Sequence, residues 1–167
     1  MNYRPVGRSR GFTIVELLMV IVVIAILATI TIVAYNNIQR RANTSSAATS
    51  AAMSVKKTEL YNTEIGGYPT TSSLLTAANS AASYRLNGVT ITGTAIAAAP
   101  ASPSTLNFWR CGTAAAAAAT SLATITVTTG IQYRYWNYMT NALVTVNAGL
   151  TTGNSSAGYA VTCYIAS

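Results

Sequence analysis

Histidine and aspartate are absent from this 167-residue chain, and its three acidic residues are Glu16, Glu59 and Glu64. General acid–base chemistry and metal binding draw mainly on His, Asp, Glu and Cys. A Ser-His-Asp or Cys-His arrangement is therefore impossible, and an oxygen-ligand calcium cage would lack carboxylates. We expect a protein that is not an enzyme and that holds no metal or cofactor.

Charge of either sign is scarce. Only 8% of the residues are charged, although the formal net charge is +7. A surface so poor in charge indicates a neutral exterior of Thr, Ser, Asn and Ala rather than a nucleic-acid binder. Arg4, Arg8 and Arg10 precede the long apolar run, so removal of that leader would lower the charge from +7 to +4.

The apolar run extends from Phe12 to Ala34, which is long enough to cross a bilayer as a helix of about 20 residues. Glu16 interrupts it near its start. A carboxylate deep in such a segment costs about 2.5–3.5 kcal/mol on insertion scales, and less near the end. Residues 12–39 contain no Lys, Arg or His, so an ionic partner for Glu16 must lie upstream or on another chain.

An ordinary signal anchor is the alternative for this segment, and a secretory signal peptide would need a cleavage site of small residues after it. Ile32-Val33-Ala34 matches such a site only weakly. The carboxylate of Glu16 and the helical pattern that continues beyond Ala34 argue against both.

A single long helix is predicted over about residues 12–65, because no Pro or Gly interrupts that stretch. It would be about 80 Å long at about 1.5 Å per residue. Gly66-Gly67-Tyr68-Pro69 is a strong stop signal. A break near Asn36-Asn37 is the alternative, since Asn is a poor helix former. The face expected to pack on a sheet carries Ile38, Ala42, Ser45, Ala48, Ala52 and Val55.

The remainder of the chain is rich in β-branched and aromatic residues, which favour strands. Thr129-Gly130 and Thr140-Asn141 each separate two such runs, so both are expected to be hairpin turns. We predict an α+β fold, with the long helix packed on a C-terminal antiparallel sheet of three or four strands. The Ala114–Ala119 tract has no clear assignment. The runs expected to be strands are 89–92, 122–128, 131–139, 142–146 and 159–166.

Cys111 and Cys163 are the two cysteines. An even pair in an exported chain predicts a disulfide, and two buried free thiols are the alternative. Closing a loop of about 50 residues would stabilise the fold by about 4 kcal/mol on a chain-entropy argument. The alternation of the last run indicates that Cys163 faces inward.

Cations and aromatic rings alternate in the segment Arg134-Tyr135-Trp136, and a second such group occurs at 108–110. One hypothesis is a surface patch that stacks nucleic-acid bases or grips sugars. The alternative, which we favour, is ordinary strand packing of alternating aromatic side chains. Glu59 and Glu64 are expected to be solvated charges on the helix.

The opening block, with a short basic leader, Gly11, and then "FTIVELLMVIVVIAILA", resembles the type IV pilins and the related pseudopilins of type II secretion. The resemblance implies that a prepilin peptidase cuts between Gly11 and Phe12 and methylates the new amine of Phe12. The subunit would wait in the cytoplasmic membrane, anchored by residues 12–34, until assembly machinery draws it into an extracellular helical filament of identical subunits. Adhesion, twitching motility and DNA uptake are the roles implied.

The same resemblance implies a task for Glu16. Its carboxylate would neutralise the Phe12 amine of an adjoining subunit and so set the axial register of the filament. The expected segments are the leader 1–11, the membrane and filament-core helix 12–34, its amphipathic continuation 35–66, a variable region 67–110, and the sheet 111–167 with a disulfide-bounded C-terminal region.

Two departures from the family pattern concern the apolar helix. Many pilins carry a glycine and a proline where this chain has Ala25 and Val33, and that region melts in their filaments.

Major pseudopilins hold calcium near the C-terminus with acidic ligands, whereas this chain has no acidic residue after Glu64. The late cysteine pair therefore favours a pilin over a pseudopilin. A membrane-anchored surface-binding domain that never polymerises is the alternative of another class.

Overall fold

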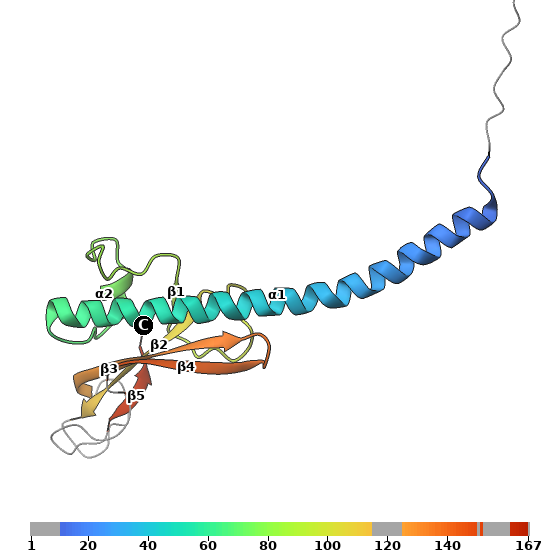
Figure 1. The fold of residues 1–167 in the computed structure, drawn as a ribbon. Coiled ribbons are helices and arrows are strands. Elements are labelled where there is room, and N and C mark those ends of the chain that lie inside the picture. The colour runs from blue at the N-terminus through green and yellow to red at the C-terminus, as the bar shows by residue number, and fades with distance from the viewer. Residues whose placement is uncertain (1–10, 115–124, 150, 152–160, 167) are drawn as a thin grey trace, which may run out of the picture. The chain divides into compact units, whose positions relative to one another are not determined.

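The computed structural model describes residues 11–114, 125–149, 151 and 161–166 (Figure 1). The chain divides into two compact units, one ending at Gln39 and the other beginning at Arg40. The long helix α1, Ile14–Ile65, runs through both. The second unit also contains a short helix α2, Ser73–Thr76, and all the strands.

Helix α1 confirms the predicted long helix, and no break occurs at Asn36-Asn37. It ends at Ile65 because Gly66 adopts a positive φ of 82° and its N–H donates to the Asn62 carbonyl at 2.9 Å. That left-handed residue is the usual helix terminator.

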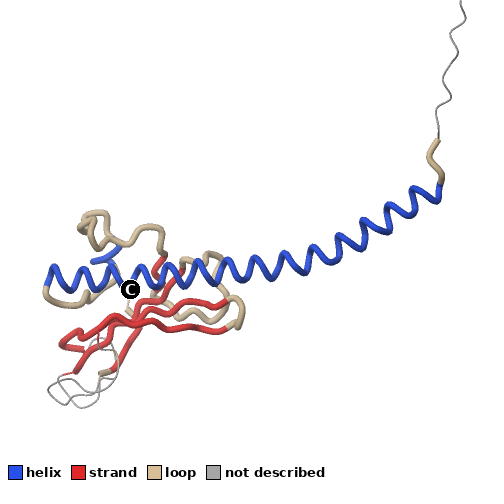
Figure 2. Tube along the Cα trace, in the orientation of Figure 1, coloured by secondary structure: helices blue, strands red, loops and turns tan. Residues whose placement is uncertain are grey.

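The sheet is mixed and has five strands (Figure 2). The meander of β2, β3 and β4 is antiparallel, as predicted of the sheet, but the sheet has more than the three or four strands predicted and β1 is parallel. The other edge of β2 is shared, since β1 pairs with its first residues in parallel and β5 pairs antiparallel with later ones. The strands are β1 Thr90–Thr92, β2 Thr105–Ala114, β3 Ile125–Asn137, β4 Ala142–Gly149 and β5 Thr162–Ile165.

Two details of the predicted strands are wrong. Strand β2, at the centre of the sheet, lies largely in the stretch expected to be a variable loop up to residue 110. Thr129-Gly130 forms no turn, because β3 runs straight through it and Gly130 pairs with Cys111 on one side and Gly149 on the other. The predicted turn at Thr140-Asn141 is present between β3 and β4, and Asn141 has a φ of 52°.

The face of α1 that packs on the sheet also differs from the prediction. Its buried residues are Ala47, Ala51, Ser54, Thr58 and Tyr61. Of the predicted face, Ile38, Ala42, Ser45 and Ala52 are exposed, and Ala48 and Val55 are half-buried. Small residues occur on every side of this half of the helix, so their spacing does not select a face.

Polar side chains of α1 reach the sheet instead. The Thr58 and Tyr133 hydroxyls are 2.7 Å apart in the core. Arg40 Nε donates to the Tyr138 carbonyl at 2.6 Å, and the Thr44 hydroxyl accepts from the Tyr138 N–H at 3.1 Å. These contacts fix which side of the helix faces the strands.

Glu59 is half-buried and is not the solvated charge that the sequence predicts. Its carboxylate accepts the Tyr68 hydroxyl at 2.9 Å and the Gly149 N–H at 2.9 Å. Gly149 has a φ of 71°, and a Cβ there would lie 2.4 Å from Cζ of Tyr68. The carboxylate therefore ties the helix to the loop after it and to the end of β4.

Asn107 of β2 is 1% exposed and holds the segment after β1. Its Oδ1 accepts the Ile96 N–H at 3.0 Å, and its Nδ2 donates to the carbonyls of Thr92 and Thr94 at 3.2 and 2.6 Å. One side chain thus satisfies the carbonyl of the last residue of β1 and two backbone groups of the segment that follows it.

We predict that Asn107→Ala lowers the free energy of unfolding by about 2–4 kcal/mol, because buried backbone groups that lose a partner cost about 1–3 kcal/mol each. Thermal unfolding of the full chain in detergent, followed by fluorescence of Trp109 and Trp136, measures this. The control is Asn147→Ala on exposed β4, expected to stay within about 0.5 kcal/mol. Equal losses in both variants would contradict the assignment.

The second prediction concerns alkaline pH. Burial, and then the Glu59 carboxylate, raise the pKa of Tyr68 to about 12. The unfolded chain therefore loses this proton first, at about pH 10. The contribution to stability is complete below pH 10 and is lost as the pH rises to about 12. Tyr68→Phe should flatten part of that loss in unfolding measurements from pH 9 to 12, and an unchanged slope would contradict it.

Candidate processing and assembly site

Gly11 and Phe12 precede α1, and the Phe12 side chain is 87% exposed. A Cβ built on Gly11 would meet nothing within 4 Å, and the residue has no positive φ. The fold of the chain thus supplies no steric reason for glycine at position 11. Any requirement for glycine must come from what binds this segment, as expected for a peptidase that approaches the backbone.

Thr13 and Glu16 form a capping box at the start of α1. Oε2 of Glu16 accepts from the Thr13 N–H at 2.9 Å and from its hydroxyl at 2.8 Å. The Glu16 N–H donates in return to the Thr13 hydroxyl at 3.2 Å. This reciprocal pair satisfies backbone donors that a helix start leaves open.

The capping box was missed at the level of the sequence, although Thr13-Ile14-Val15-Glu16 has its spacing. Only Lys, Arg and His were considered there as partners of Glu16, and Thr13 is uncharged. Both accepted bonds use Oε2, so Oε1 remains open to a further donor. The carboxylate is thereby oriented toward the Phe12 end of the helix.

The first half of α1 exposes apolar side chains on all sides, from Ile14 at 84% to Val33 at 62%. Among the described residues, α1 is the helix that is long and apolar enough to cross a membrane. The hydroxyls of Thr29 and Thr31 donate to the carbonyls of Ala25 and Ala28, at 2.7 and 2.9 Å. Polar groups within the run are therefore satisfied inside the helix, as a lipid environment requires.

Residues 7–32 match the family model of the prokaryotic N-terminal methylation motif. The chain carries this methylation motif. The motif is characteristic of type IV pilin-like proteins. No curated protein and no solved structure matches the chain. The basic residues of the motif's leader, Arg4, Arg8 and Arg10, lie outside the described residues.

The predicted disulfide is present, between Cys111 and Cys163. The two residues stand directly opposite each other on β2 and β5. Cys111 is fully buried and Cys163 half-buried. This late bridge, together with the methylation motif and the apolar helix, agrees with a pilin-type protein. The Ala115–Ala119 part of the unassigned tract lies outside the described residues.

The structure does not bring Arg134, Tyr135 and Trp136 to one surface. Tyr135 packs against the core cluster, whereas Arg134 stacks over the Trp109 ring, with Cζ 3.9 Å from the ring centroid. Nε of Arg134 also donates to Oε1 of Gln132 at 2.9 Å. Trp136 is half-buried. The three residues therefore alternate across the strand, and Trp109 is the ring that accompanies the cation.

Metal ligands do not gather in the part of the chain that the structure describes. There, no three residues of the types His, Cys, Asp and Glu lie close enough together to hold an ion. The scarcity of acidic residues and the lack of histidine in the sequence account for this.

Proposed function

We propose that this chain is the structural subunit of an extracellular filament of the type IV pilus kind. The observation that carries the proposal is the methylation motif, whose Gly11-Phe12 junction immediately precedes an exposed apolar helix with a capped Glu16. A structural rather than catalytic role agrees with a sequence that lacks histidine and aspartate.

Processing would convert the amide nitrogen of Phe12 into a cation that can form an ion pair. In the precursor, the Phe12 nitrogen belongs to a peptide bond. Cleavage after Gly11 by a prepilin peptidase, followed by methylation, would create a cationic nitrogen at the edge of an apolar environment. The free Oε1 of Glu16 on an adjoining subunit would receive it, and a charge left unpaired in such a setting costs about 3–5 kcal/mol.

Assembly would then exchange one apolar environment for another. Lipid covers the side chains of residues 12–34 while the subunit waits in the cytoplasmic membrane, and the same helices of other copies cover them in the filament. Membrane assembly machinery would drive the exchange. The hydrophobic effect distinguishes little between these two environments, so the ion pair supplies the register.

A pilin is favoured over a pseudopilin of type II secretion, because no acidic residue follows Glu64 and the C-terminal strand carries a disulfide. Adhesion, twitching motility and DNA uptake depend on partners of the filament. Nucleic-acid or glycan binding by Arg134 and its neighbours has little support, since Tyr135 packs in the core. A membrane-anchored binding domain that does not polymerise is the competing function.

The proposal predicts the state of the N-terminus. Mass spectrometry of filaments sheared from cells should find a chain that begins at a methylated Phe12. A chain that begins at Met1 and stays in the membrane fraction would instead support the anchored domain.

Two substitutions separate the charge of Glu16 from its role as a cap. Glu16→Gln keeps an oxygen that can accept from Thr13 but removes the charge. Thr13→Val removes the two bonds made by the hydroxyl, and keeps both the charge and the backbone N–H that donates to Glu16. If the ion pair sets the register, Glu16→Gln should leave less than about a tenth of the wild-type filaments, because about 1.4 kcal/mol already shifts an equilibrium tenfold. Thr13→Val should assemble nearly normally.

Electron microscopy of sheared material, with leader cleavage followed by immunoblot, provides the measurement. Both variants should be cleaved and inserted. Normal filaments from Glu16→Gln, or loss of filaments from Thr13→Val alone, would show that capping rather than charge pairing matters.

A further inference from the structure

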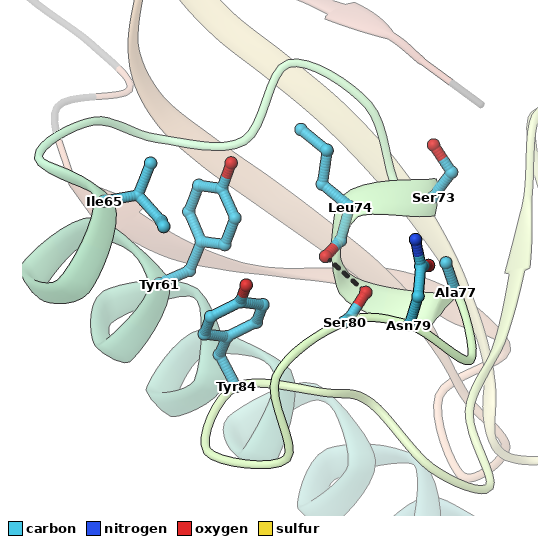
Figure 3. A pocket seen from close by; sticks show the side chains of 8 residues that line it. All are labelled: Tyr61, Ile65, Ser73, Leu74, Ala77, Asn79, Ser80 and Tyr84. Atoms are coloured by element: carbon cyan, nitrogen blue, oxygen red, sulfur yellow. Dashed lines mark hydrogen bonds between the residues drawn. The ribbon is translucent and has the colours of Figure 1, made fainter.

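A pocket of about 350 Å³ lies where the loop that contains α2 folds back on the last turns of α1 (Figure 3). Leu75 is fully buried and its carbonyl accepts the Leu86 N–H at 2.7 Å, which holds α2 in place. The lining residues are Tyr61, Ile65, Ser73, Leu74, Ala77, Asn79, Ser80 and Tyr84. Small-molecule sites range from about 300 to 1,000 Å³, so this pocket would hold one small molecule.

One wall of the pocket is aromatic. The rings of Tyr61 and Tyr84 meet edge to face, with centroids 4.9 Å apart and an interplanar angle of 79°. Tyr61 is buried, whereas Tyr84 is half-buried and presents its ring and hydroxyl to the pocket (Figure 3). Ile65 continues this wall and is 58% exposed. The wall thus offers an apolar surface with hydroxyl groups.

The opposite wall is polar and also uncharged. The exposed Asn79 amide can both donate and accept, and Ser73 adds a hydroxyl. The Ser80 hydroxyl donates to the Leu74 carbonyl at 2.8 Å, so its lone pairs remain able to accept (Figure 3). A ligand would therefore meet hydrogen-bonding groups across from the rings.

None of the described residues that line the pocket has a charged side chain. Two cations of the neighbouring sequence are engaged elsewhere, since Lys57 Nζ donates to the Ser83 carbonyl and Arg85 Nη1 to the Ala78 carbonyl at 2.8 Å. An anionic ligand would be desolvated here without a counter-ion, which is unfavourable. An acyl chain would leave the amide and hydroxyl groups without partners.

We propose that this pocket binds a neutral saccharide unit. A pyranose ring has one face of C–H groups, which suits the half-buried ring of Tyr84, and an equator of hydroxyls, which suits the amide and serines opposite. The proposal goes beyond filament formation and does not depend on it, because the pocket lies wholly within the unit that begins at Arg40.

The test uses the full chain in a detergent without a sugar headgroup. Saturation-transfer NMR is run with a panel of neutral probes, the methyl glycosides of glucose, galactose, mannose, N-acetylglucosamine and N-acetylgalactosamine, and with sialic acid as an anionic probe. At least one neutral glycoside should show transfer and saturable binding, and sialic acid should show none.

Four variants of the pocket and one control variant locate the binding. Tyr84→Ala should weaken it at least about tenfold, which corresponds to about 1.4 kcal/mol, whereas Tyr84→Phe keeps the ring and should retain most of it. Ala77→Phe fills the pocket without removing a contact and should abolish binding. Asn79→Ala removes the amide of the polar wall. Its matched control is Asn147→Ala, which removes an exposed amide of β4 outside the pocket.

Circular dichroism and the unfolding temperature show that each variant is folded. No transfer to any neutral glycoside, binding that survives in Ala77→Phe, or stronger binding of sialic acid would each overturn the proposal. Filament formation plays no part in the readout, so its failure leaves this test unaffected.

Discussion

A carboxylate at the start of an apolar helix needs hydrogen-bond donors, and the proposed function depends on which groups supply them. Within the chain, Thr13 donates twice to Glu16, while the backbone of that first turn is capped in return. The bonds engage one oxygen and orient the carboxylate toward Phe12. In the proposed precursor, this carboxylate would therefore have donors before its partner exists, and processing at the neighbouring residue would create the remaining donor.

The second half of the same helix solves a different problem, which is how to hold a sheet with side chains that are mostly small. Hydrophobic contact from alanine is limited because little area is buried per residue. Hydrogen bonds from Arg40, Thr44, Thr58 and Glu59 supplement it and bind the β3–β4 turn, the core and the end of β4 in succession. The first half of α1 thus exposes apolar side chains on all sides, whereas the second half makes hydrogen bonds to particular residues of the sheet.

This contrast explains what could be predicted from the sequence. The extent of α1 follows from the absence of Pro and Gly and from Gly66 at its end, and the α+β class follows from the composition of the two halves. The buried face of α1 could not be predicted, because it is chosen by Thr58 and Arg40 through partners more than 70 residues away. Periodicity of small residues carries no information on such contacts.

The sheet and the candidate sites also divide into features that the local sequence predicts and features that depend on distant contacts. Strand β2 was missed because "TLNFWRCGTA" has few β-branched residues, and its burial depends on neighbours that only the fold supplies. Thr129-Gly130 resembles a turn, yet Gly130 lies where β3 is flanked by a strand on both sides. Gly11, Phe12 and Glu16 could be proposed from the sequence because they form a local motif. The Tyr61–Tyr84 pocket could not, because its walls are distant in the sequence.

Strand β2 finally accounts for how two very short strands are retained. Strands β1 and β5 have three and four residues, so their ladders contain few hydrogen bonds. Each is supplemented by one side chain of β2, since Asn107 holds the segment after β1 and Cys111 is bonded covalently to β5. Both supplements act on the same edge of β2, which would otherwise present unpaired backbone groups to other chains.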